Sequence, residues 1–117
     1  MAKSALFIGW GQPVVGREQK ALQLFGEVMQ YYGRLQQQGE LDGFEPILLD
    51  AHGGDLNGFI LLRGDTEKLA RLRTDPEFVD TVTRAQLYLT NVGVVTAWYG
   101  EGLQQQMGAF QKHVATL

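Results

Sequence analysis

The stretch Gly58-Phe59-Ile60-Leu61-Leu62-Arg63 is apolar on both of the faces that a β-strand presents. Side chains alternate along a strand, so its odd-numbered residues would face one side of a sheet and its even-numbered residues the other. The runs Ala5–Trp10 and Asn91–Tyr99 have the same character, because neither alternates cleanly between apolar and polar side chains. An antiparallel sheet with one solvated face shows such an alternation. The sequence therefore predicts a sheet that is covered on both faces.

The spacing of apolar residues around this strand predicts the order strand, helix, strand, strand, helix, strand, with one more helix at the end. The predicted strands are Ala5–Trp10, Phe44–Leu49, Gly58–Arg63 and Asn91–Tyr99. The predicted helices are about Arg17–Gln38, a segment that begins after Asp65 and restarts at Thr74, and Gly100–Leu117. Two split βαβ units of this kind give a four-stranded antiparallel sheet with both main helices on one face. We therefore expect a ferredoxin-like α+β fold in a single domain 1–117, with a core of about residues 4–99 and a C-terminal helix of about residues 100–117.

Two helices cover only one face of such a sheet, so something else must bury the other face. A large exposed apolar patch is rare on a soluble monomer, and the same face of a second copy is the simplest cover. The final helix carries a narrow apolar stripe, typical of a coiled-coil seam. This helix would either clamp a partner subunit or fold back over its own sheet. The stripe consists of Leu103, Met107, Phe110, Val114 and Leu117.

The stretch Arg73-Thr74-Asp75-Pro76-Glu77-Phe78 opens the second main helix with a small residue, a proline and an acidic–aromatic pair. Together with the element order and the two-faced sheet, it resembles the dimeric α+β barrel superfamily, which includes YCII-like proteins, antibiotic-biosynthesis-type monooxygenases and EthD-like proteins. The resemblance covers about residues 4–99 and implies a homodimer of ferredoxin-like protomers. No catalytic signature of those families matches residue by residue, and the helix 100–117 departs from their minimal pattern.

Composition narrows the classes of function. The chain has 117 residues and a net charge of −3, so it lacks the basic surface expected of a protein that binds nucleic acid or a membrane surface. It contains no cysteine, which excludes every cysteine-based metal site. Gly9–Gly16 lacks the lysine of a phosphate-binding loop, and no cofactor is expected. No run is long enough for a membrane span or a signal-peptide core, so a cytoplasmic location is expected.

His52 is the main candidate for acid–base chemistry, in the run Asp50-Ala51-His52-Gly53-Gly54-Asp55. It would act as a general base oriented by Asp50, or join Asp50 and Asp55 as a metal ligand, or simply stand in a polar hairpin turn. Arg63 would stabilise an oxyanion or reach solvent at the end of its strand. His113 is expected at the edge of an interface.

Four large aromatic residues would line an apolar pocket for a flat organic ligand, or else belong to the core or an interface. They are Trp10, Tyr31, Trp98 and Tyr99. The sequence thus favours a homodimer that binds a small organic molecule between sheet and helices. The alternative is a cofactor-independent enzyme of the monooxygenase or isomerase type, with His52 as base and Arg63 as oxyanion stabiliser.

Overall fold

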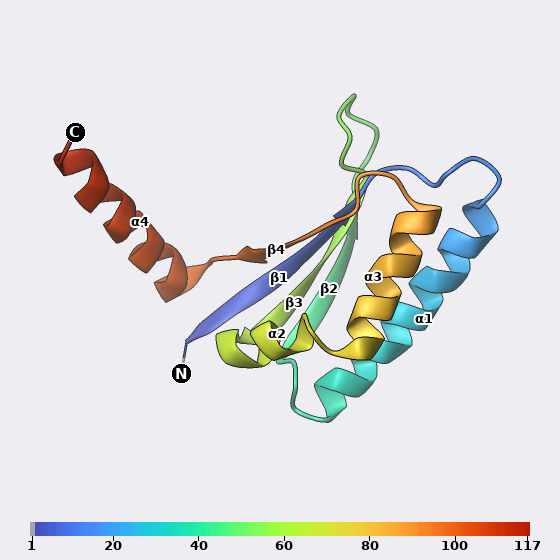
Figure 1. The fold of residues 1–117 in the computed structure, drawn as a ribbon, viewed down its shortest axis with the longest axis horizontal. Helices are drawn as coiled ribbons and strands as arrows, with labels where there is room; N and C mark the ends of the chain where they lie inside the picture. The colour runs from blue at the N-terminus through green and yellow to red at the C-terminus, as the bar shows by residue number, and fades with distance from the viewer. Residues whose placement is uncertain (1) are drawn as a thin grey trace.

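Four strands and four helices make up the computed structural model of the chain, which describes residues 2–117 (Figure 1). In chain order they are β1 (Lys3–Trp10), α1 (Glu18–Gln37), β2 (Gly43–Leu48), β3 (Gly58–Asp65), α2 (Thr66–Leu72), α3 (Pro76–Tyr88), β4 (Gly93–Ala97) and α4 (Gly100–Ala115). The strands pair antiparallel in the order β2-β3-β1-β4. This confirms the predicted ferredoxin-like α+β fold, and Pro46 lies in an edge strand, as expected.

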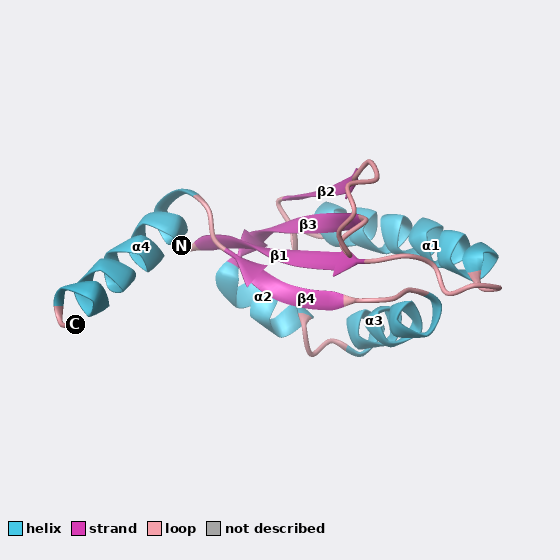
Figure 2. Cartoon of the chain, turned by 90° about the horizontal axis from the view of Figure 1, so that it is seen from above, coloured by secondary structure: helices cyan, strands magenta, loops and turns pink. Residues whose placement is uncertain are grey.

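Helices α1 and α3 pack side by side on one face of the sheet (Figure 2). The even-numbered residues of β1 and β3 point to this face, and Leu6, Leu62 and Ile60 are at most 3% exposed. The start of α3 follows from its sequence, since Pro76 occupies the first turn and the Asp75 carboxylate accepts a hydrogen bond from the Glu77 amide at 3.2 Å. The stretch that we expected to open this helix therefore does so.

The buried side of α1 differs in part from the stripe that its apolar spacing predicts, which consists of Ala21, Leu22, Phe25, Val28, Met29, Tyr32 and Leu35. Leu24 and Tyr31 are buried, whereas Leu22, which we expected in the core, is 67% exposed. The reason is that α1 packs against α3 as well as the sheet, so its buried surface extends toward α3. The Tyr31 hydroxyl, for example, donates to Asp75 at 3.2 Å, next to the start of α3.

The other face of the sheet is not covered by any helix of residues 2–117 (Figure 2). We call it the open face; its apolar side chains are Phe7, Ile47, Phe59, Leu61 and Val95. The Phe7 and Phe59 rings stack there with their centroids 4.8 Å apart, and Val95 is 55% exposed. Both faces of the sheet are apolar, as the sequence indicated.

Helix α4 projects away from the body on the side of the sheet opposite α1 and α3 (Figure 1). It contains no buried residue, so it does not fold back over its own sheet. The radius of gyration is 16.0 Å, against roughly 13 Å for a compact chain of this length. None of the helices of residues 2–117 combines the length and the apolar character that a membrane span requires.

Candidate functional site

A cavity of about 580 Å³ lies between the helix-covered face of the sheet and the helices α1 and α3. This volume is within the range of about 300–1,000 Å³ that small-molecule sites occupy. Small side chains face the cavity from both helices, Ala21 on α1 and Ala85 on α3, and leave the space that larger residues would fill. The cavity is therefore a consequence of which residues these two helices present to the sheet.

The walls are almost entirely apolar. Trp10 and Phe25 meet edge to face inside, with ring centroids 6.3 Å apart. Leu22 and Leu48 also line the cavity and are 67% and 76% exposed, so they mark the side on which it opens to solvent. An apolar, partly enclosed space with aromatic walls is suited to a flat organic molecule.

Few polar side chains reach the cavity: Gln12, Glu18, Tyr32, Asn57 and Thr81. Glu18 is the one charged residue among them, it is exposed, and its carboxylate accepts a hydrogen bond from the Gly16 amide at 2.9 Å. The Thr81 hydroxyl donates to the Phe78 carbonyl oxygen at 2.7 Å. No lysine, arginine or histidine lines this space, so it offers no positive charge to an anion.

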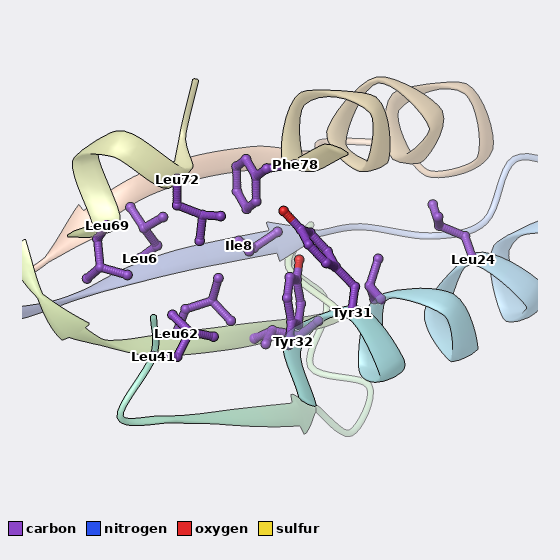
Figure 3. Close-up of a cluster of buried hydrophobic side chains, with 12 residues drawn as sticks. Leu6, Ile8, Leu24, Tyr31, Tyr32, Leu41, Leu62, Leu69, Leu72 and Phe78 are labelled. Carbon is purple, nitrogen blue, oxygen red and sulfur yellow. The ribbon is translucent and has the colours of Figure 1, made fainter. Parts of the chain in front are cut away.

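Tyr32 is the most buried of the polar residues that line the cavity, at 2% exposed. Its ring extends from α1 into the space between the sheet and α3 (Figure 3) and meets Phe44 edge to face at 5.9 Å. Burial raises the pKa of Tyr32 well above its usual value, so the phenol stays protonated at neutral pH. Its hydroxyl can therefore act as a hydrogen-bond donor.

Of the four aromatic residues that we expected in a pocket, Trp10 lines this cavity. Tyr31 lies instead at a separate polar hollow of about 350 Å³, where burial and the neighbouring Asp75 carboxylate raise its pKa. Trp98 and Tyr99 lie between β4 and α4 and are 39% and 42% exposed. The four side chains therefore do not form one pocket.

His52 lies in the exposed loop between β2 and β3, outside the residues that line the cavity. Its Nε2 is 2.6 Å from the Leu56 carbonyl oxygen, and its Nδ1 accepts a hydrogen bond from the Gly54 amide at 3.3 Å. These contacts hold the loop together. Asp50 is exposed in the same loop, and no three His, Asp or Glu side chains of residues 2–117 converge on a metal site.

Arg63 lies on the open face of the sheet, where it forms an ion pair with Glu45 at 2.7 Å. The cavity is on the opposite face, because it is lined by the even-numbered residues of β1 and β3. Neither Arg63 nor His52 is therefore among the residues that line the cavity with Trp10.

The polar residues of the cavity that sequence reasoning missed are Gln12, Tyr32, Asn57 and Thr81. Tyr32 was expected in the core stripe of the first helix, which is where it lies. The sequence signal that could have identified Tyr32 is its hydroxyl within the otherwise apolar stripe of the first helix, because a buried hydroxyl requires a hydrogen-bond partner.

Solved structures of several proteins share this fold. A dimeric protein of unknown function from Bacteroides fragilis, described as ferredoxin-like, superposes with a TM-score of 0.60 at 12% identity, covering 83% of this chain and 96% of that one. An ethyl tert-butyl ether d (EthD) family protein from Bacillus halodurans gives a TM-score of 0.58 at 10% identity, covering 85% and 100%.

SnoaB, a cofactor-independent oxygenase from Streptomyces nogalater, superposes with a TM-score of 0.53 at 19% identity, covering 85% of this chain and 97% of that one. No protein-family model matches the sequence, and no curated protein matches it. At these identities the likeness establishes the fold, and it agrees with the resemblance to dimeric α+β barrel proteins that the sequence indicated.

Proposed function

We propose that the protein is a homodimer in which each protomer binds a small, flat organic molecule in the cavity between the sheet and helices α1 and α3. The observation that carries this proposal is the apolar cavity of about 580 Å³ with an aromatic wall and an opening to solvent. A ligand there would gain hydrophobic contact from Trp10 and Phe25 and orientation from one or two polar groups.

The homodimer follows from the open face. The accessible surface of the chain is 7694 Å², whereas a compact monomer of this mass exposes roughly 6,300 Å². Among the exposed large apolar side chains, those between Val95 and Leu117 lie on the open face, at the β4–α4 junction and on α4, where a second copy would cover them. The neighbouring structure from Bacteroides fragilis is described as dimeric, which supports the same arrangement here.

The ligand site can be tested with a tryptophan reporter, because the chain has two tryptophans and only Trp10 lines the cavity. In the Trp98→Phe variant, we expect 9-fluorenone, a flat neutral ketone, to quench Trp10 fluorescence saturably. ATP, which needs a phosphate-binding loop, should not do so.

Ala85→Leu in the same background fills the cavity and should weaken fluorenone binding about tenfold or more, or 1.4 kcal/mol. Ala70→Leu is the matched control, since Ala70 is exposed on α2 and does not line the cavity. Absence of saturable quenching by fluorenone, or equal weakening by both substitutions, would contradict the proposal.

The second candidate is a cofactor-independent enzyme of the monooxygenase or isomerase type. The likeness in fold to SnoaB, a cofactor-independent oxygenase, favours it. In this proposal His52 removes a proton and Arg63 steadies an oxyanion, although both lie outside the cavity of a single protomer. Oxygen uptake with 1-naphthol that is lost in His52→Ala or Arg63→Ala would favour the enzyme, and no uptake would favour simple binding.

A further inference from the structure

Within residues 2–117 the Tyr32 hydroxyl forms no hydrogen bond, which is unusual for a side chain that is 2% exposed. Among the side chains of residues 2–117 that are not exposed, the fully inaccessible polar atoms all have a polar partner, and even Asp65 Oδ1 lies 2.9 Å from the Lys3 ammonium. Because Tyr32 Oη has no such partner, it must keep some contact with open space. The cavity is the space that Tyr32 lines.

The remaining buried hydroxyl of the cavity cannot take the same role. Thr81 already donates its proton to the Phe78 carbonyl at 2.7 Å, so it can only accept from a ligand. Tyr32 is thus the buried hydroxyl whose proton is free. Its ring is held in place by Phe44 at 5.9 Å and Tyr31 at 5.5 Å, so the donor is fixed before a ligand arrives.

Charge decides which acceptor fits. No cationic side chain lines the cavity, and the one charged residue there, Glu18, is negative. A carboxylate or phenolate brought to Tyr32 would lose its hydration without gaining a counter-charge. A neutral carbonyl oxygen needs only the hydrogen bond that Tyr32 supplies.

We propose that the Tyr32 hydroxyl donates a hydrogen bond to a neutral carbonyl oxygen at the buried end of the ligand. The cavity then selects aromatic ketones and quinones over aromatic hydrocarbons and over aromatic carboxylates. This inference rests on the proposed function, since it names the class of molecule that the same cavity binds and the residue that recognises it.

The test compares 9-fluorenone, fluorene and fluorene-9-carboxylate, which share a ring system and differ in the polar group. The affinity ratio of fluorenone to fluorene should fall about 3- to 10-fold in Tyr32→Phe, the loss expected for one hydrogen bond. Tyr31→Phe is the matched control, because the adjacent Tyr31 hydroxyl donates to Asp75 rather than into the cavity. That variant should keep the ratio of the unmodified protein.

A second measurement needs no change in affinity. The carbonyl stretch of bound fluorenone should shift to lower frequency in the unmodified protein, as it does on accepting a hydrogen bond, and should return to its apolar-solvent position in Tyr32→Phe. Melting curves of both variants establish that they fold.

The outcomes separate the two proposals. If neither fluorenone nor fluorene binds, the ligand-binding function is overturned and this inference with it. If both bind but Tyr32→Phe leaves the ratio and the carbonyl stretch unchanged, the role of Tyr32 is overturned and the ligand site stands. Tighter binding of fluorene-9-carboxylate than of fluorenone would overturn the neutral-carbonyl class.

Discussion

Lys3, at the start of β1, joins two segments that are distant in the sequence. Its ammonium lies 2.8 Å from the Asp42 carboxylate before β2 and 2.9 Å from the Asp65 carboxylate at the end of β3. Asp65 is the residue before α2, yet its side chain makes no capping bond, because it turns toward Lys3. The hydrogen bond and charge of Lys3 lower the pKa of the Asp65 carboxyl.

Replacing Lys3 should therefore destabilise the protein in a pH-dependent way. The pKa of Asp65 is lower in the folded chain than in the unfolded one, so its ionised carboxylate stabilises the folded protein. This stabilisation is fully present above the unfolded pKa of 3.8 and is lost as the pH falls through the folded pKa. Lys3→Met should lower the melting temperature by a few degrees at pH 7. The gap to the unmodified protein should close below about pH 4.

Thermal denaturation between pH 2 and pH 7 measures this gap. Lys20→Met on α1 is the matched control, since Lys20 is exposed and forms no ion pair with residues 2–117, and it should change the melting temperature little at any pH. A gap for Lys3→Met that is the same at pH 2 and pH 7 would contradict the role given to this ion pair.

For individual residues, the chemical role was harder to predict from the sequence than the position in the fold. Arg63 was assigned correctly to one face of its strand, but the sequence does not say which face the helices cover, and the cavity is on the other. His52 was recognised as a turn residue, and its contacts to Leu56 and Gly54 depend on the local path of the loop. Tyr32 could be placed in the core, whereas its lack of a partner depends on every side chain around it.

Whole elements were more predictable, because each depends on many residues. All four strands and the helices lie where the apolar spacing placed them. The main differences are at ends: β4 covers Gly93–Ala97 rather than Asn91–Tyr99, since Asn91 has a positive φ of 52° and Trp98 and Tyr99 already turn toward α4. Such ends are set by tertiary packing rather than by periodicity.

The position of α4 leads to a prediction about assembly. Its stripe residues are about half exposed or more, with Leu103 at 47%, Met107 at 49% and Phe110 at 62%, so the protomer core does not depend on them. The triple variant Leu103→Gln, Met107→Gln, Phe110→Gln should therefore keep the secondary structure of the protomer and weaken the dimer. Each side chain would contribute up to about 1.5–3 kcal/mol if the interface buries it fully.

Sedimentation velocity across a dilution series would measure the dimer, and circular dichroism the protomer. The control is Gln105→Ala with Lys112→Ala, on the opposite side of α4, which should leave the dimer unchanged. If the triple variant dimerises as well as the unmodified chain, α4 has no part in the interface.

At the scale of the whole molecule, exposed apolar side chains follow one another along the chain from β4 to the end of α4. Val95 on the open face is followed by Trp98 and Tyr99 at the β4–α4 junction, and then by the stripe of α4. The side chains that are at least 39% exposed along this path are Val95, Trp98, Tyr99, Leu103, Met107, Phe110, Val114 and Leu117. His113 lies on the same helix and is exposed, at the border of this surface. A two-fold axis through the open face would bury both this face of the sheet and the apolar stripe of α4.

A single carboxylate on the open face should separate the protomers. Val95 is 55% exposed, so Val95→Glu leaves its new charge in water on an isolated protomer, but would bury that charge unpaired in the dimer. An unpaired buried charge costs about 3–5 kcal/mol, and two-fold symmetry would bring in two copies of it. Val79→Glu on α3 introduces the same charge at a site that is 45% exposed and away from the open face.

Light scattering at low micromolar concentration should give about twice the 13.0 kDa chain mass for the unmodified protein and for Val79→Glu, and the chain mass for Val95→Glu. A 13.0 kDa particle for the unmodified chain, or a dimer that survives Val95→Glu intact, would show that the open face is not where two copies meet.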